Sequence, residues 1–321
     1  MSRLRPRALR VPRRVRAPRA AVRAPDRWVE AEDGVRLAAW VQEPAAPAPE
    51  PVTVVLVHGW TLAAAAWDRA VAELTRARPQ VRVVRYDQRG HGASDASSAA
   101  SSVASFVAGP RGGDAAASIG RLGDDLAAVV RALAPHGPLV LGGHSMGGMA
   151  VLSATGRHRD LLGPRTRGVL LCSTSAGGLS PAGRPLVPFM AALARLPEGL
   201  PVPRAPRLLT QRTNYGPGVD PALVTATSRA MGPVSGRSTG AWFAALMAHD
   251  ETAALPALAA SGVRVRVLVG DADRLTPHQH AEALAAALPE AVLSVVPGAG
   301  HMLLVERPDV VAGALEALLA P

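Results

Sequence analysis

Segment 143–147 reads Gly-His-Ser-Met-Gly and places Ser145 in a Gly-x-Ser-x-Gly pattern. An apolar run at 139–141 precedes this segment, and a run with helical character at 146–155 follows it. A serine between a strand and a helix is forced into a strained turn, and glycines on either side let the chain pass closely. The turn pushes the hydroxyl over the helix N-terminus, where free amide groups favour negative charge. The pattern therefore predicts that Ser145 is a nucleophile.

A serine nucleophile needs a general base, because its hydroxyl is barely ionised at neutral pH. Among nine histidines the best candidate is His301, which lies in a Gly-flanked loop after the last apolar run. We interpret His58 and His91 as structural, since each lies in a Gly-rich turn of its own, and His144 as the variable position of the Ser145 turn. The sequence predicts His301 as the base.

The base in turn needs an acidic residue that fixes its tautomer and stabilises the imidazolium. Segment 269–277 follows an apolar run and contains Asp271 and Asp273. We favour Asp273 because it lies in the loop that leads to a predicted helix start at Pro277, whereas Asp271 is closer to the strand end. Asp271 stays open as the alternative. The stretch 173–175 follows another apolar run and is the other position considered for the acid, but it contains only Ser and Thr.

Acyl transfer also requires hydrogen-bond donors for the developing oxyanion. One predicted donor is the main-chain amide of Met146, directly after the nucleophile. The second is the main-chain amide of Trp60, in the His-Gly-Trp turn at 58–60 that follows the apolar run 53–57.

Short apolar runs and helix-like stretches alternate along most of the chain. The predicted strands cover 53–57, 81–86, 139–141, 168–172, 263–269 and 291–296, after a predicted hairpin around the turn at 32–34. The predicted helices cover 123–134, 146–155, 277–288 and 309–319. Alternation of this kind predicts a mostly parallel sheet, whose ligands bind beyond the carboxyl ends of the strands. The polar residues named above cluster after those strand ends.

We divide the chain into an Arg- and Pro-rich disordered tail (1–25), two parts of one core (26–175 and 256–321) and a helical cap (176–255). A Ser-, Ala- and Gly-rich loop at 96–118 is predicted to be mobile. Helical pieces of the cap are expected at 187–196, 221–231 and 240–249. Five of its side chains either line an acyl pocket or form only the cap's own core: Leu193, Leu196, Trp242, Phe243 and Met247.

Composition excludes several classes of protein. All 35 basic residues are Arg, and nine of them lie in the tail, so residues 26–321 carry 26 Arg against 25 acidic residues. Nucleic-acid binding is therefore not expected. We interpret the tail as a loose extension, with weak attachment to anionic lipid, as peripheral membrane contact, or to RNA as the alternative. The single cysteine, Cys172, excludes a disulfide framework and a cysteine-based zinc site. His278 and His280 are two positions apart at a predicted helix start, so their side chains diverge and a metal site there is not expected. The sequence contains no uninterrupted run of about 18 apolar residues, the length needed to span a membrane. We expect a cytoplasmic protein without metal.

Taken together, these motifs resemble the α/β-hydrolase fold superfamily. The resemblance rests on the turn at 58–60, Tyr-Asp-Gln-Arg-Gly-His-Gly at 86–92, the Ser145 segment, Gly-Asp-Ala-Asp at 270–273 and Gly-His at 300–301, in the family's order. It implies a sheet of about eight strands covered by helices on both faces, with a helical cap. It also implies a catalytic triad of Ser145, Asp273 and His301, with oxyanion amides at Trp60 and Met146.

The resemblance further implies a carboxylic ester hydrolase that acts on a small apolar ester or acyl substrate without a cofactor. Serine at the nucleophile position disfavours haloalkane dehalogenases and soluble epoxide hydrolases, which have aspartate there. The alternatives are thioesterase, amidase, lactonase or cofactor-free perhydrolase (haloperoxidase-type) activity on the same triad. A non-catalytic, ligand-binding member of the fold is a remote third interpretation.

Overall fold

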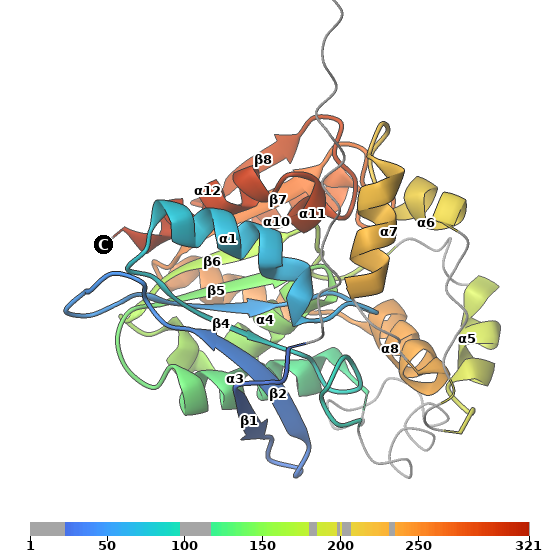
Figure 1. Cartoon of the computed structure of the whole chain (residues 1–321), viewed down its shortest axis with the longest axis horizontal. Coiled ribbons are helices and arrows are strands. Elements are labelled where there is room, and N and C mark those ends of the chain that lie inside the picture. The colour runs from blue at the N-terminus through green and yellow to red at the C-terminus, as the bar shows by residue number, and fades with distance from the viewer. Residues whose placement is uncertain are drawn as a thin grey trace, which may run out of the picture.

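The computed structural model describes residues 23–96, 117–179, 185–197, 200, 207–230 and 235–320. Nearly all of the predicted tail and of the predicted mobile loop lies outside these residues. The described residues form one eight-stranded sheet with helices on both of its faces (Figure 1). The strands are β1 (Arg27–Glu30), β2 (Arg36–Gln42), β3 (Thr53–Val57), β4 (Arg82–Tyr86), β5 (Leu139–His144), β6 (Thr166–Cys172), β7 (Arg264–Gly270) and β8 (Val292–Val296).

The strand order is β1-β2-β4-β3-β5-β6-β7-β8. β2 pairs antiparallel with both β1 and β4, and every later pair is parallel. This arrangement confirms the predicted mostly parallel sheet, with the predicted hairpin at its edge. Because β3 and β5 are neighbours in the middle of the sheet, their carboxyl ends bring the 58–60 turn beside the Ser145 turn.

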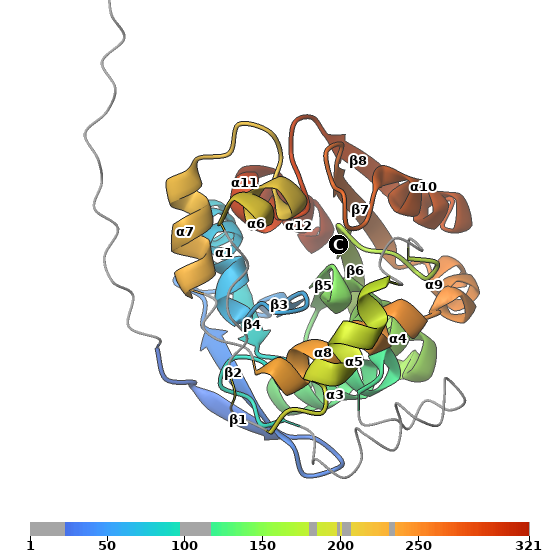
Figure 2. The same cartoon turned by 90° about the vertical axis from the view of Figure 1, so that its right-hand side faces the viewer.

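Helices cover both faces of the sheet, as the turned view shows most clearly (Figure 2). The core helices are α1 (Asp68–Ala77), α3 (Ile119–Leu133), α4 (Met146–Arg157), α9 (Leu255–Ala260), α10 (His278–Ala287), α11 (Leu303–Glu306) and α12 (Pro308–Leu319). Short 3-10 turns lie at Ala64–Trp67, Arg159–Leu162 and Thr252–Ala254.

Alternation along the central strands divides the apolar side chains between two cores. In β3, Val55 and Val57 pack in one core, with α3, α4 and α10, whereas Val54 and Leu56 pack in the other, with α1, α11 and α12. Successive side chains of a strand point to opposite faces, so a strand covered on both sides must be apolar throughout. All five residues of β3 are buried, which agrees with this requirement.

The segment between β6 and α9, for which a cap was predicted, carries four α-helices among its described residues. They are α5 (Val187–Leu193), α6 (Arg207–Asn214), α7 (Pro221–Ala230) and α8 (Gly236–Ala248), and we call residues 176–255 the β6–β7 segment. Its two ends meet, because Gly177 and Asp250 form a β-bridge and the Glu251 amide donates to the Ala176 carbonyl at 2.6 Å. The segment thus leaves the sheet and returns at one place.

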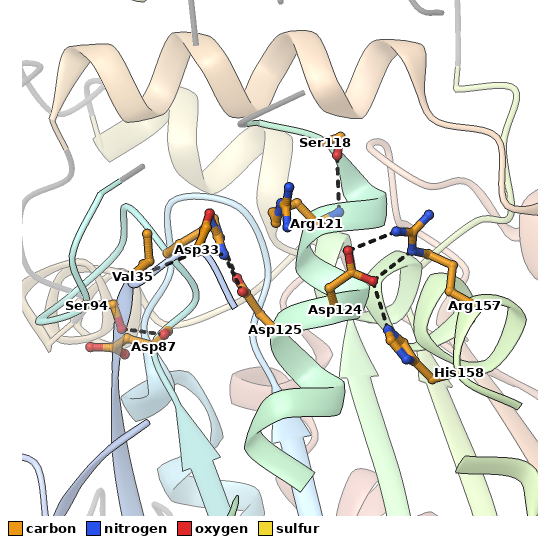
Figure 3. A network of polar contacts seen from close by, with 11 residues as sticks. Asp33, Val35, Asp87, Ser94, Ser118, Arg121, Asp124, Asp125, Arg157 and His158 are labelled. Carbon is orange, nitrogen blue, oxygen red and sulfur yellow. Dashed lines mark hydrogen bonds and ion pairs between the residues drawn. The ribbon is translucent and has the colours of Figure 1, made fainter. Parts of the chain in front are cut away.

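A buried arginine joins the loop after β4 to two other elements. The Arg89 side chain is fully buried and forms ion pairs with Asp125 of α3 and with Asp33 of the β1–β2 turn. Nε of Arg89 donates to Oδ2 of Asp125 at 2.6 Å, and Nη1 donates to Oδ2 of Asp33 at 2.7 Å. Figure 3 shows both carboxylates beside the first turns of α3, where the neighbouring Asp124 binds Arg157 and His158 at the end of α4. A buried guanidinium requires such partners, since an unpaired charge is strongly unfavourable in the interior.

We predict that Asp125→Ala lowers the free energy of unfolding by about 3–5 kcal/mol, because it leaves the Arg89 guanidinium buried without its best-shielded partner. Asp33→Ala is expected to have a smaller effect, since the Asp33 side chain is 35% exposed and that of Asp125 only 1%. Urea unfolding measures both. Asp160→Ala, which removes a solvent-exposed partner of Arg131, serves as the control and should cost about 1 kcal/mol or less. Equal losses in all three variants would contradict a special role for the buried pair.

Candidate active site

Ser145 lies between β5 and α4 in a backbone conformation that residues other than glycine rarely adopt, with φ 54° and ψ −122°. Its amide donates to the Cys172 carbonyl at 2.9 Å, and its carbonyl accepts a hydrogen bond from the Thr174 hydroxyl at 2.7 Å. From position 138 to position 155, every residue except Ser145 is buried. The fold thus holds a strained serine rigidly and leaves it half-exposed.

The two glycines beside Ser145 allow the close packing that this conformation requires. A Cβ atom on Gly143 would lie 2.3 Å from the Gly147 carbonyl oxygen, and one on Gly147 would lie 2.2 Å from the carbonyl oxygen of Val57. Both distances are far below van der Waals contact. The Gly-x-Ser-x-Gly pattern therefore has a steric cause at both of its glycines.

His301 lies in the loop between β8 and α11, and its ring contacts the carboxylate of Asp273. Nδ1 of His301 is 2.9 Å from Oδ2 of Asp273 and 3.1 Å from Oδ1. Both side chains are buried. Thr276 holds the carboxylate in place, because its amide donates to Oδ1 and its hydroxyl to Oδ2, each at 2.9 Å. The Nδ1–H tautomer that this contact selects leaves Nε2 of His301 as the proton acceptor.

The electrostatics of Asp273 favour its ionised form. Burial by itself raises the pKa of this carboxyl, but the nearby His301 charge and the hydrogen bonds from His301 and Thr276 lower it, and the net pKa lies below the ordinary value. Asp271 has a different role, since its Oδ1 accepts the Gly298 amide at 2.7 Å. Of the two candidate aspartates, it is Asp273 whose carboxylate contacts the histidine.

His144 connects the Ser145 turn to the His301 loop. Its Nε2 donates to the His301 carbonyl at 2.8 Å, and the two rings lie 5.0 Å apart between centroids. Ser145 and His301 are therefore at the same edge of the sheet. Burial, together with the charge of His301, lowers the pKa of His144 to about 3, so this bridge is made by a neutral imidazole.

The turn at 58–60 packs directly against Ser145. A Cβ atom on Gly59 would lie 3.1 Å from Cβ of Ser145. The fully buried His58 holds the turn, because its Nε2 accepts the Gln88 amide at 2.9 Å while the Gln88 side-chain amide donates to the His58 carbonyl at 2.6 Å. The Met146 amide is in the first turn of α4 and so has no partner within the helix. Among the described residues, the Trp60 amide donates to no main-chain carbonyl.

Aromatic side chains join this turn to α8 of the β6–β7 segment. Nε1 of Trp60 donates to the Thr239 carbonyl at 3.2 Å, and the Trp60 and Phe243 rings lie 5.5 Å apart. Trp242 instead packs in the hydrophobic core, with its ring 6.3 Å from that of His91. Of the five side chains considered for an acyl pocket, Phe243 therefore contacts the 58–60 turn, and Trp242 packs against the loop after β4. Leu193, Leu196 and Met247 are half-buried.

Two residues at this site were not identified from the sequence. Thr276 follows Asp273 by three positions, the spacing at which an aspartate accepts hydrogen bonds from the backbone of its own turn, and this signal was available. The sequence indicates His144 only as the variable position of the Ser145 turn. Its bond to residue 301 spans 157 positions, and nothing local in the sequence indicates it.

Neither a metal centre nor a membrane span is found in the described part of the chain. There, no three His, Cys, Asp or Glu side chains group so that they could hold a metal ion. Likewise, none of its helices combines the length and the apolar character needed to cross a bilayer.

Comparison with known proteins identifies the fold. A sequence profile described as "Alpha/beta hydrolase family" matches residues 54–314. No curated protein matches the sequence significantly. Many solved structures match, and three of them are described next.

A thermophilic esterase from Thermogutta terrifontis is 24% identical, with a TM-score of 0.70, over 91% of this chain and 98% of its own. A hydrolase from Pseudomonas aeruginosa PA01 is 26% identical, with a TM-score of 0.68, over 92% and 98%. An enol-lactonase from Burkholderia xenovorans LB400 is 21% identical, with a TM-score of 0.68, over 91% and 99%. These similarities, with the profile match, confirm the fold class expected from the sequence.

The buried histidines around the site predict a loss of stability in acid. Burial lowers the pKa of His58 to about 4, and burial with the nearby charge of His58 lowers that of His91 to about 3, against an ordinary value of 6.5. Below pH 6.5 these histidines are therefore protonated in the unfolded chain but remain neutral in the folded chain. Each such histidine should reduce the free energy of unfolding by up to about 1.4 kcal/mol per pH unit, until the pH reaches the folded-state pKa.

His91→Gln tests this linkage, because it removes one of these protons and keeps a polar side chain. Urea unfolding at pH 7, 6 and 5 should show a smaller loss of stability on acidification than in the wild type. The same substitution at the exposed His136 controls for the loss of an imidazole away from the buried histidines. Parallel pH curves for the wild type and His91→Gln would show that the proton linkage lies elsewhere.

Proposed function

The chain belongs to the alpha/beta hydrolase family, and on this premise we propose that it is a serine hydrolase that cleaves a carboxylic ester or a related acyl compound. The observation that carries this proposal is Ser145 itself: a strained, half-exposed serine in an otherwise buried segment. A fold has no structural need for a strained polar residue that faces solvent, and such strain is typical of functional sites. Asp273 and His301, hydrogen-bonded at the same sheet edge, support the proposal.

In the proposed mechanism, Oγ of Ser145 attacks the carbonyl carbon while Nε2 of His301 accepts the hydroxyl proton. The resulting oxyanion accepts hydrogen bonds from the amides of Met146 and Trp60. Collapse of this intermediate breaks the bond to the alcohol, which leaves with the proton from His301, and an acyl-serine remains. Water, deprotonated by His301, then attacks the acyl carbon, and the bond to Oγ breaks as His301 returns the proton to Ser145, which releases the acid.

Asp273 is assigned to orient and stabilise His301 in this mechanism. Its lowered pKa means that it is ionised at neutral pH, so that it can stabilise the imidazolium formed during attack. The hydrogen bonds from Thr276 keep the carboxylate facing Nδ1. No step of the proposed mechanism requires a metal or an organic cofactor.

The β6–β7 segment is proposed to act as a cap that selects an apolar acyl group. The contact between Phe243 of α8 and Trp60 supports this role, because it places an aromatic surface beside the proposed oxyanion donor. A cytoplasmic location is proposed as well, and it agrees with the single, buried cysteine, which has no intrachain partner for a disulfide.

A chain-length series of p-nitrophenyl esters tests the proposed reaction. We expect the wild type to hydrolyse short and medium acyl esters, and Ser145→Ala to reduce turnover by roughly 10³-fold or more. Ser175→Ala, which removes a buried hydroxyl after β6, is the matched serine control and should remain active. Equal residual rates in the wild type and Ser145→Ala would refute the esterase proposal, and a preference for thioesters or lactones in parallel assays would redirect it.

Two conservative substitutions distinguish the candidate aspartates. Asp273→Asn should lower kcat by roughly 10⁴-fold, because the neutral amide no longer favours the required tautomer of His301. Asp271→Asn retains an oxygen that can accept the Gly298 amide, so its kcat should stay within about tenfold of the wild type on the same reasoning. Steady-state hydrolysis of one p-nitrophenyl ester measures both, and the reverse order of effects would move the acid to Asp271.

A further inference from the structure

Glu306, the last residue of α11, is hydrogen-bonded to two loops that lie far apart in the sequence. Its carboxylate oxygens accept the Gly300 amide, each at 3.1 Å, and Oε2 also accepts the Gly216 amide at 2.8 Å. Gly300 directly precedes His301. Gly216 lies in the β6–β7 segment, two residues after the end of α6. A single carboxylate thus joins the loop of the proposed base to the segment proposed as a cap.

The two loops are also in direct backbone contact at this point. The Met302 amide donates to the Asn214 carbonyl at 3.0 Å. A Cβ atom on Gly216 would lie 2.0 Å from the Gly298 carbonyl oxygen, and one on Gly300 would lie 2.4 Å from the Gly216 nitrogen. Neither position can carry a side chain unless the loops separate. Residues 214–216 and 298–302 therefore form one packed unit, and the Glu306 carboxylate accepts hydrogen bonds from both of these segments.

We propose that Glu306 is a positioning residue that sets the place of His301 and couples it to the β6–β7 segment. This inference rests on the proposed function, in which His301 is the base. His301 is held through its ring by Asp273 and through its carbonyl by His144. Glu306 holds the backbone just before His301 through the Gly300 amide, and together with the Met302–Asn214 hydrogen bond it links the β6–β7 segment to the loop that carries the imidazole.

The consequence for catalysis follows from geometry. A general base works only within hydrogen-bond reach of its proton, and a displacement of about 1 Å can cost roughly 100-fold in rate. Loss of the Glu306 carboxylate leaves the Gly300 amide without its acceptor and removes the hydrogen-bonded link between Gly300 and Gly216. We therefore expect the effect in kcat rather than in KM for a short acyl ester, because a short ester makes little contact with the β6–β7 segment.

Two substitutions distinguish the effect of the side-chain length of Glu306 from the effect of its charge. Glu306→Gln keeps the length of the side chain and one oxygen that can accept both amides, but it loses the charge. Glu306→Asp keeps the charge but is one methylene too short to reach both loops. We expect kcat for p-nitrophenyl acetate to fall by about 10- to 100-fold in Glu306→Asp and by less in Glu306→Gln. Glu316→Asp, on the solvent side of α12 and paired with Arg78, is the control and should match the wild type.

A second readout is independent of activity. We expect the proton between Nδ1 of His301 and Asp273 to give a downfield ¹H NMR signal in the wild type. This signal should broaden or shift in Glu306→Asp and persist in Glu306→Gln and in the control. A wild-type-like signal and kcat in Glu306→Asp, or a larger loss in Glu306→Gln than in Glu306→Asp, would overturn the inference. If the wild type hydrolyses no ester, the proposed function fails, and the NMR series still decides whether Glu306 positions His301.

Discussion

The turn at Ser145 is the constraint around which the centre of the molecule is organised. The chain must pass from β5 to α4 within one residue, in a conformation that costs of order 1–3 kcal/mol. That conformation persists because its surroundings leave no alternative: Gly143 and Gly147 pack backbone against backbone, and both main-chain polar groups of Ser145 are hydrogen-bonded to the end of β6 or the loop that follows it. The central position of β5 in the sheet supplies the rigidity that keeps the turn strained.

The same constraint explains why neutral histidines surround the site. Close packing at the strand ends excludes water, and a charged imidazole there would have no solvent to stabilise it. His58 and His144 instead act as neutral hydrogen-bonding groups, one fixing the 58–60 turn to Gln88 and the other fixing the Ser145 turn to His301. Each has a strongly lowered pKa, caused mainly by burial. The site thus keeps its buried charge on the hydrogen-bonded Asp273, where it can act on His301.

The sequence predicted the sheet well because its strands carry their own signal. β3 was predicted with its observed bounds, since a strand covered on both faces is apolar at every position. β5 was predicted to end at 141 but continues to His144. Gly142 and Gly143 pair with Leu56 and Val57, but glycine has no side chain that could contribute to the apolar pattern of a strand. α1 was missed although its buried residues, at 70, 71 and 74, have helical spacing.

The site was predictable only where chemistry is local. Ser145, the aspartates and His301 each follow a strand in a recognisable turn, so their meeting at one edge follows from parallel topology. The contacts that hold them do not: His144 reaches residue 301, and Glu306 reaches residue 216, through packing that depends on the whole fold. Such contacts follow no spacing rule, so the sequence alone does not indicate them.

The loop after β4 shows how structural residues can influence a site without touching it. His91 contacts the His58 ring on one side and Trp242 of α8 on the other, while Arg89 anchors the loop to α3 and to the β1–β2 turn. A Cβ atom on Gly90 would lie 2.9 Å from the Ser238 hydroxyl, so α8 rests directly on this loop. The buried Arg89 network therefore supports both the turn that offers the Trp60 amide and the helix that carries Phe243. Because these two elements share one support, the placement of the proposed oxyanion donor and that of the apolar wall beside it cannot vary independently.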